Sequence, residues 1–285
     1  MKCLYINLDS ASARREGLEA SFRAHAPAGW ELIRIPAFGP DDVGAVAGAI
    51  TTKEKACWRS HQAAIAAALD DADDVLILED DTRLGPRTFA MLERVRTANL
   101  QWDLLFTEVG LEMEDLLFYA QRYPSLAASG KLSVQDLARR RFTAAAGYMV
   151  RGASKAKLST LLGDVANLDR AYDYQLQHLT HAGHVQSLFC FPFITQPGAQ
   201  AGESQIQLEG LRLRDRTHLA YRRLMCVDRD LDALEAELTQ LEAIHGDRGA
   251  ALMGKVFGVF TSVALLKSVE AAAQPATADG PALAS

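Results

Sequence analysis

The chain is poor in cysteine, and its four cysteines form no recognisable motif. Cys3, Cys57, Cys190 and Cys226 lie far apart among apolar neighbours, with no C-x-x-C pair and no Cys/His metal-binding spacing. Such a distribution is typical of reduced, buried thiols in a cytosolic protein. We therefore expect a cytoplasmic protein without a disulfide framework.

Motifs of several well-known protein classes are also missing. There is no G-x-x-x-x-G-K or G-x-G-x-x-G phosphate-binding loop, no G-x-S-x-G nucleophile turn and no internal repeat. The formal net charge of −6 argues against a general nucleic-acid-binding protein. Lys2 is followed by only a short apolar run, so we expect no secretory signal peptide.

The most informative stretch that is present ends in three consecutive acids. Four apolar residues, Val75 to Leu78, lead directly into Glu79, Asp80 and Asp81. The apolar run is typical of a strand buried on both faces of an α/β sheet, and such sheets bind ligands at the carboxyl ends of their strands. Adjacent carboxylates repel one another, and a divalent cation with oxygen ligands would neutralise them. A solvated acidic turn is the alternative.

Strands and helices alternate over the first two-thirds of the chain. The pattern predicts strands at residues 3–8, 30–35, 75–78, 102–106, 142–150 and 185–191, with helices at 51–69, 86–96, 152–162 and 168–182. Residues 111–137 have no clear period and are interpreted as a loop with short helices, and residues 192–204 as a mobile surface loop. We therefore expect a mainly parallel α/β sheet flanked by helices.

Polar residues near the ends of these elements are candidates for a binding site. Arg14, with Arg15, opens a helix after the first strand and is either a solvated basic turn or a phosphate contact. Glu54, Cys57 and His61 are spaced three and four apart, so they share one face of a helix.

Three further acids lie next to predicted elements. Glu108 follows the strand at 102–106, and Asp169 and Asp173 lie near the start of the helix at 168–182. For Asp169, a role as helix cap or first-turn acid is the alternative to a catalytic role.

The last part of the chain has a different pattern. Apolar residues recur in alternating steps of three and four, at Leu224, Val227, Leu231, Leu234, Leu238 and Leu241. This a/d seam predicts either a homodimer through Leu224–Leu241 or packing on a neighbouring helix. A second apolar helix between Lys255 and Lys267 is too short to span a bilayer and would lie in the core or at a membrane interface. Residues 271–285 are predicted to be a disordered tail.

Taken together, several separated motifs resemble glycosyltransferase family 25, the lipooligosaccharide galactosyltransferases and the related collagen galactosyltransferases. The matching stretches are Tyr5-Ile6-Asn7-Leu8-Asp9 with Arg14-Arg15, Glu54-Lys55-Ala56-Cys57 with Ser60-His61, Leu78-Glu79-Asp80-Asp81, residues 143–150 with Gly147-Tyr148, and Leu168-Asp169. They cover residues 2–205. The family often has Pro-Val-Asp where this chain has Asn167-Leu168-Asp169, and the heptad region has no counterpart among the motifs.

The resemblance implies a GT-A-like (Rossmann-like) catalytic domain at residues 1–210, followed by a helical region at 211–270. It also implies a UDP-sugar donor, a divalent metal (Mn or Mg) and inversion at the anomeric carbon. Asp81 and Glu79 would hold the metal that bridges the two phosphates. Asp169, with Asp173 in reserve and Glu108 third, would take the proton of the acceptor hydroxyl.

The remaining matching residues would shape the donor site. Asn7, Asp9 and Arg14 would contact uracil, ribose or phosphate, and Asp80 would lie beside the metal. Glu54 and His61 would line the donor pocket.

The predicted activity is transfer of a hexose, with galactose favoured by the resemblance, from UDP-hexose to a lipooligosaccharide or other surface-glycan acceptor. A lipid-linked acceptor would place the enzyme peripherally on the cytoplasmic face of the inner membrane. Two alternatives remain open. An acid cluster also suits a metal-dependent phosphohydrolase, and the chain could be a catalytically silent nucleotide- or glycan-binding scaffold.

Overall fold

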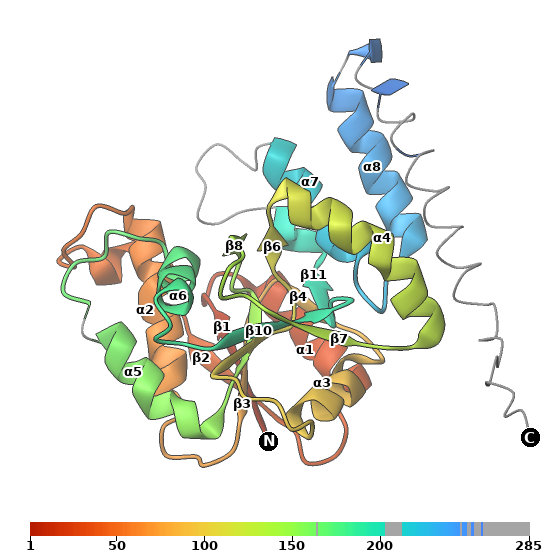
Figure 1. The fold of residues 1–285 in the computed structure, drawn as a ribbon. Helices are drawn as coiled ribbons and strands as arrows, with labels where there is room; N and C mark the ends of the chain where they lie inside the picture. Colours follow the sequence, from red (N-terminus) through yellow and green to blue (C-terminus); the bar gives the residue numbers. More distant parts are fainter. Residues whose placement is uncertain (164, 203–212, 246, 250–251, 254–257, 259–285) are drawn as a thin grey trace, which may run out of the picture.

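The fold is built on one seven-stranded sheet with helices on both faces (Figure 1). The structure, a computed structural model, describes residues 1–163, 165–202, 213–245, 247–249, 252–253 and 258. The strand order is β2-β1-β3-β9-β5-β10-β7. β1, β2 and β3 are parallel, β9 is antiparallel to both β3 and β5, and β10 is parallel to β5. Five strands therefore run in one direction, which confirms the predicted Rossmann-like, mainly parallel α/β sheet.

The element bounds are as follows. The main sheet contains β1 (Lys2–Asn7), β2 (Glu31–Pro36), β3 (Val75–Glu79), β5 (Leu104–Phe106), β7 (Ser133–Asp136), β9 (Gly147–Val150) and β10 (Ser187–Phe191). Two small sheets pair β4 (Thr82–Leu84) with β11 (Thr195–Pro197) and β6 (Gly110–Leu111) with β8 (Phe142–Thr143). The helices are α1 (Ser12–His25), α2 (Thr52–Ala67), α3 (Thr88–Arg96), α4 (Met113–Ser129), α5 (Lys155–Gly163), α6 (Tyr172–His181), α7 (Leu213–Leu224) and α8 (Leu231–His245). Short 3-10 turns are η1 (Pro40–Val43), η2 (Gly152–Ser154) and η3 (Ala199–Gly202).

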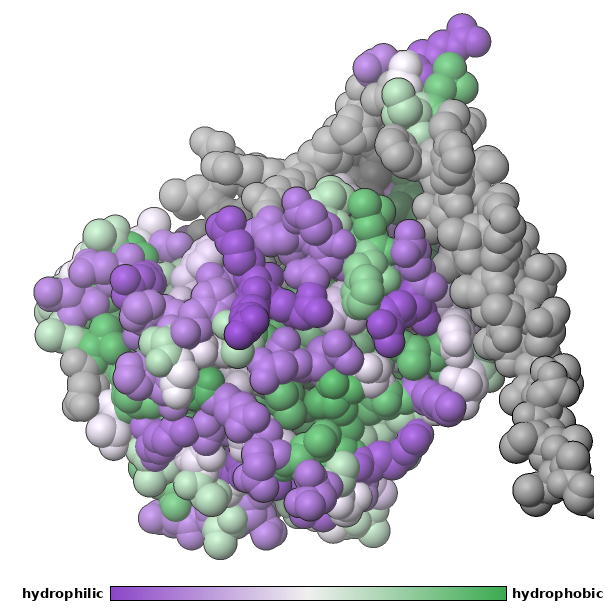
Figure 2. Space-filling model, viewed as in Figure 1, coloured by the Kyte–Doolittle hydropathy of each residue, from purple (hydrophilic) through white to green (hydrophobic). Residues whose placement is uncertain are grey.

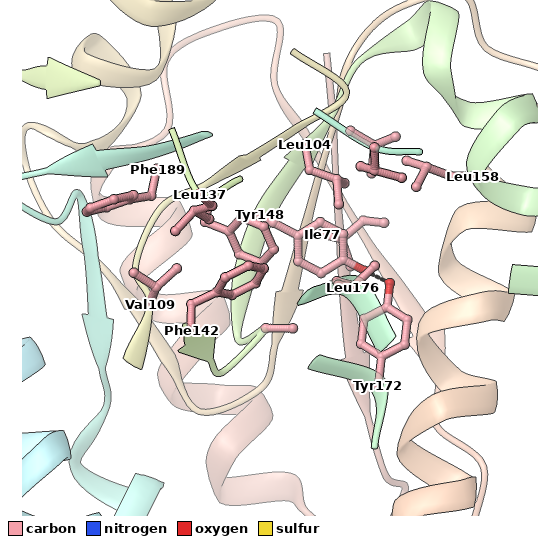
Figure 3. Close-up of a cluster of buried hydrophobic side chains, with 14 of the residues drawn as sticks. Ile77, Leu104, Val109, Leu137, Phe142, Tyr148, Leu158, Tyr172, Leu176 and Phe189 are labelled. Carbon is pink, nitrogen blue, oxygen red and sulfur yellow. Dashed lines mark hydrogen bonds between the residues drawn. The ribbon is translucent and has the colours of Figure 1, made fainter. Parts of the chain in front are cut away.

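The core has two layers, one on each face of the sheet. Alternate side chains of a strand point to opposite faces, so Ile77 packs in the layer with α2, α5 and α6, whereas Leu76 packs in the layer with α1 and α3. Figure 3 shows the first layer, in which Ile77, Leu104 and Tyr148 from neighbouring strands lie together. All four apolar residues of β3 are at most 1% exposed, which confirms a strand buried on both faces.

The carboxyl ends of the central strands meet at one edge of the sheet. The register pairs Ile6 with Glu79 between β1 and β3, and Leu78 with Gly147 where antiparallel β9 begins. Gly147 is required there, because a Cβ would lie 2.4 Å from Thr107 Oγ1, which follows β5. This edge therefore brings together the residues that follow β1, β3 and β5.

The prediction of a loop with short helices at 111–137 is wrong, because most of this stretch is the single continuous helix α4. Leu116, Tyr119 and Tyr123 are spaced three and four apart and pack into the core. Leu117 and Phe118 remain 56% and 42% exposed. These outward-facing apolar residues hide the helical period in the sequence.

The surface loop predicted at 192–204 is wrong for residues 192–197, which are buried, whereas Ala199 further along is exposed. Phe193, Ile194 and Thr195 are at most 1% exposed, and β11 pairs with β4 directly after the acidic triplet. The turn signals Pro197 and Gly198 are real, but Gly198 lies against β4: its N–H donates to Asp81 O at 2.5 Å. Proximity to the sheet decides the burial of this segment.

A single heptad helix through Leu224–Leu241 is not formed. α7 ends at Leu224 and α8 begins at Leu231, while between them Val227 is buried and its N–H donates to Phe193 O at 2.8 Å. Of the residues that the pattern assigned to the seam, Val227 and Leu234 are buried in the protein, whereas Leu231 and Leu238 are 53% and 42% exposed. The predicted homodimer stays a prediction.

Part of the C-terminal prediction lies outside the described residues. This applies to the tail at 271–285 and, apart from residue 258, to the apolar helix between Lys255 and Lys267. Among the described helices, none combines the length and apolar character that crossing a bilayer requires.

Candidate functional site

The acid Asp80 is held at the sheet edge by residues from β1 and α1. Its side chain is only 8% exposed. Asn7 Nδ2 donates to Asp80 Oδ2 at 2.7 Å, and Arg14 donates to Asp80 Oδ1 at 3.2 Å. Burial raises the pKa of Asp80 in spite of these partners. The predicted residues Asn7, Arg14 and Asp80 therefore form one hydrogen-bonded group.

Arg14 extends this group to Asp81 and to η3. Its guanidinium lies 3.4 Å from Asp81 Oδ2 and donates to Gln200 O at 3.1 Å. The acids are thus partly neutralised within the chain, so a bound cation is not required to hold Asp80 in place. The neutralisation of Asp81 is incomplete. Burial is the main cause that raises its pKa to about 7, and the negative charges of Glu79 and Asp80 add to it.

Glu79 points away from Arg14, towards α2. Its Oε1 lies 3.1 Å from His61 Nε2 and 3.9 Å from Cys57 Sγ. Burial is the largest single effect and opposes ionisation of Glu79, but the hydrogen bond with His61 and the charges of His61, Arg222 and Arg14 together lower its pKa. The Glu79 side chain is 31% exposed, so solvent reaches it.

His61 is almost fully buried, and two tyrosines hold its ring in place. Its ring stacks on Tyr172 with centroids 4.2 Å apart, and its Nδ1 lies 3.0 Å from the hydroxyl of Tyr148. The hydroxyls of Tyr148 and Tyr172 are 2.8 Å apart, a contact drawn in Figure 3. The family motif contained His61 and Tyr148, but Tyr172 gave no sequence signal of this role.

A buried ion pair lies behind the acids. Arg222 Nε is 3.5 Å from Glu108 Oε2, and the two side chains are 10% and 0% exposed. The positive charge of Arg222 also lowers the pKa of Glu79 and Asp81, against the larger effect of burial. Sequence reasoning missed Arg222, because α7 carries no motif and its contact with β5 depends on the tertiary fold.

Arg34 of β2 was also missed. It donates to Asn7 Oδ1 at 3.0 Å and to Asn7 O at 2.9 Å, and it pairs with Asp9. Asp9 is 88% exposed, so it lies at the rim and not among the buried acids. A sequence signal for this role existed: Arg34 lies near the end of the strand that pairs with β1.

Glu54 has a structural contact of its own. It forms a capping box with Thr51: the Glu54 carboxylate accepts from Thr51 N at 2.8 Å, and Thr51 Oγ1 accepts from Glu54 N at 3.2 Å. This confirms the predicted start of α2. The proposed part of Glu54 in a donor pocket stays a prediction.

The two candidate bases differ in position. Asp169 is exposed, and its Oδ1 accepts a hydrogen bond from Ala49 N at 2.8 Å. It precedes α6, because this helix begins at Tyr172 and not at 168 as predicted. Asp173 is half-buried in the first turn of α6, and its Oδ2 accepts from Ala144 N at 3.0 Å. Burial and the charge of Glu79 raise the pKa of Asp173. Asp173 therefore lies within electrostatic reach of the acid cluster.

Hollows of the described surface lie away from the three acids. One of about 620 Å³ lies beside α1, β1 and β2 and is lined by Tyr5, Arg15, Glu19, Phe22, Arg23, Leu32 and Arg34. Figure 2 shows that hydrophilic side chains cover most of the face in view, with an apolar strip over α4. Met113, Leu117 and Phe118 are the exposed apolar residues of that helix.

Comparison with known proteins identifies no family for this chain. No protein-family model and no curated protein matches it. Among solved structures, it is similar to the galactosyltransferase LgtC in complex with donor and acceptor sugar analogues. The identity is 12% and the TM-score 0.35, over 66% of this chain and 73% of the LgtC chain. A similarity of this size does not transfer an activity from one protein to the other.

Proposed function

We propose that this protein is a metal-dependent glycosyltransferase that uses a sugar nucleotide as donor. The observation that carries the proposal is the acidic edge of β3, where Glu79 is followed by Asp80 and Asp81, both in contact with Arg14. Carboxylates and a guanidinium side by side suit a nucleotide diphosphate bound together with a divalent cation. The position at the carboxyl ends of parallel strands is where α/β sheets bind ligands.

The donor set fits a hard divalent cation. Asp81 would hold it, with Glu79 offering its Oε2, and both provide the oxygen ligands that Mn²⁺ and Mg²⁺ prefer. The raised pKa of Asp81 is consistent with a site that has too little positive charge of its own. When bound, such a metal supplies Lewis-acid stabilisation of the departing diphosphate.

The remaining residues of the edge would bind and orient the donor. Arg14 lies within reach of both Asp80 and Asp81 and would contact a phosphate oxygen. Asn7, Asp9 and Asp80 would fix the loop beside the nucleotide. The proposed donor is UDP-hexose, with galactose the sugar that the family resemblance favours.

An inverting transfer needs a carboxylate that takes the proton of the acceptor hydroxyl. We assign this role to Asp173, because its carboxylate is half-buried and electrostatically coupled to Glu79. Asp169 is the second candidate, and Glu108 the third. A surface glycan or lipid-linked glycan would be the acceptor, with the catalytic domain at residues 1–210 and the C-terminal helices at the inner-membrane surface.

The first test is a thermal-shift screen of UDP-sugars with and without Mn²⁺. A donor at 100 times its Kd stabilises the fold by about 2.7 kcal/mol, which raises the melting temperature. We expect a shift with UDP-galactose that needs Mn²⁺ and is lost in Asp81→Asn. The matched control is Asp70→Asn, an exposed acid away from the cluster.

A shift that is equal with and without Mn²⁺, or that survives in Asp81→Asn, would contradict the proposal. Release of UDP then separates the reaction classes. Release that depends on an added sugar acceptor indicates a transferase. Release without acceptor indicates hydrolysis, and metal-independent binding without release indicates a scaffold.

A further inference from the structure

We propose that Cys57, His61 and Glu79 form a second metal site, for a borderline-soft ion such as Zn²⁺. Cys57 and His61 lie one turn apart on α2, and Glu79 ends β3 opposite them. Their ligand atoms all lie within 4.8 Å of one another. The sequence concealed this trio because its third member comes from a different element.

The two ligand-atom distances from Glu79 are close to those around a tetrahedral ion. Bonds of about 2.0 Å to nitrogen or oxygen and 2.3 Å to sulfur place neighbouring ligand atoms roughly 3.3–3.6 Å apart. Glu79 Oε1 is 3.1 Å from His61 Nε2 and 3.9 Å from Cys57 Sγ. Shifts of a few tenths of an ångström would therefore bring these two distances to the tetrahedral values, and Cys57 Sγ and His61 Nε2 lie within 4.8 Å of each other.

The surroundings of His61 orient it as a ligand. Metal-binding histidines normally donate their second ring N–H to a fixed acceptor, which sets the tautomer. Here Nδ1 lies 3.0 Å from the Tyr148 hydroxyl, which is in turn 2.8 Å from that of Tyr172. With the proton on Nδ1 donated to Tyr148, the lone pair of Nε2 faces Glu79. Stacking on Tyr172 holds the plane of the ring.

The site is accessible and electrically suited to a cation. The Glu79 side chain is 31% exposed, so solvent reaches this side of the trio and could supply a fourth, exchangeable ligand. The charges of Glu79, Asp173, Asp81 and Glu54 all act on Cys57 and, after burial, raise the pKa of its thiol. Binding of the metal as a thiolate complex would release that thiol proton to solvent.

This inference does not depend on the proposed glycosyltransferase activity. The set contains a thiol and an imidazole, which select Zn²⁺ or Co²⁺, whereas carboxylate oxygens alone select Mn²⁺ or Mg²⁺. Asp81 is not part of it. Glu79 is common to both sites, but the contacts with Cys57 and His61 involve its Oε1.

The test is titration of the full chain, freed of metal by a chelator, with Co²⁺ and with Zn²⁺. We expect one equivalent of Co²⁺ to give the visible bands of a tetrahedral complex and a sulfur-to-cobalt charge-transfer band, both removed by Zn²⁺. Cys57→Ser should lose the charge-transfer band, and both Cys57→Ser and His61→Gln should weaken Zn²⁺ binding by more than about 100-fold. This limit is the upper end for loss of an outer-shell partner.

Matched variants keep the outcome decisive. Tyr148→Phe should weaken Zn²⁺ binding by about tenfold, because it removes the partner of Nδ1 and leaves the three ligand residues in place. Cys3→Ala removes a buried cysteine of the opposite core layer and should leave the cobalt spectrum unchanged. If Cys57→Ser retains the charge-transfer band, or if wild type gives no tetrahedral bands, the site is not there.

One further variant separates this inference from the proposed function. Asp81→Asn should keep the cobalt spectrum and lose the Mn²⁺-dependent donor shift. If the wild-type protein gives the cobalt spectrum but no Mn²⁺-dependent donor shift, the glycosyltransferase proposal alone is overturned. Absence of cobalt bands with an intact donor shift would overturn the Cys57–His61–Glu79 site alone.

Discussion

Arg222 of α7 and Glu108 after β5 form an ion pair inside the protein, with Nε and Oε2 3.5 Å apart. Neither Glu108 carboxylate oxygen nor Arg222 Nε has a hydrogen-bond partner among the described residues. The pair therefore depends on charge attraction in a buried setting, where each partner is costly without the other. It fixes α7 to the edge of the sheet that carries the acids.

The first prediction concerns this pair. Arg222→Met should lower the free energy of unfolding by about 3–5 kcal/mol, because it leaves Glu108 as an uncompensated buried charge. The double variant Arg222→Met with Glu108→Gln should recover most of that loss. Urea unfolding of the single and double variants measures the coupling, and additive losses would show that the two charges do not interact.

The second prediction is a pH dependence of the metal-free protein. Burial and the neighbouring acids raise the pKa of Asp81 from 3.8 to about 7, so the folded state binds its proton more tightly than the unfolded state. The contribution of Asp81 is therefore most favourable below the unfolded pKa. It is lost as the pH rises through the window from 3.8 to about 7.

Asp81→Asn removes this titration. Between about pH 4 and pH 7, the unfolding free energy of wild type should fall relative to that of the variant. Above about pH 7, the difference between the two should stay constant. Urea unfolding with a chelator present measures it. A difference that is flat across the whole range would mean that Asp81 titrates normally. Asp70→Asn, at an exposed position, is the control.

The third prediction separates the two candidate bases. Asp173→Asn should lower kcat by about 10²–10⁴-fold, the usual contribution of a general base, and leave the affinity for UDP-galactose nearly unchanged. Asp169→Asn should have a smaller effect, because Asp169 is exposed and hydrogen-bonded to Ala49 N. Steady-state UDP release with an acceptor measures both. The reverse order of effects would assign the role to Asp169.

The fourth prediction tests the close packing behind the acids. In Gly147→Ala, the new Cβ would lie 2.4 Å from Thr107 Oγ1 and 3.2 Å from the Leu78 side chain. Overpacking of this kind costs about 1–3 kcal/mol. Gly17→Ala in α1 is the matched control: nothing lies within 4 Å of its Cβ, and alanine favours a helix interior by roughly 0.5–1 kcal/mol. Thermal unfolding should therefore move in opposite directions for the two variants.

Local patterns were sufficient where neighbouring residues decide the structure. The run from Val75 to Leu78 predicted a strand buried on both faces, since only a central strand needs apolar side chains at every position. Thr51 and Glu54 predicted the start of α2, because a capping box is complete within four residues. The three acids directly after Leu78 predicted a polar edge, because they follow the buried apolar run in the sequence itself.

The sequence by itself therefore determined the α/β class, the central strand and the placement of Asn7, Arg14 and the three acids at one edge. Only the tertiary structure decided that Arg14 neutralises Asp80, that Glu79 faces His61 and Cys57, and that Arg222 reaches Glu108. Such pairings join residues far apart in the chain, and their energies depend on burial and distance. Neither quantity exists until the elements are packed together.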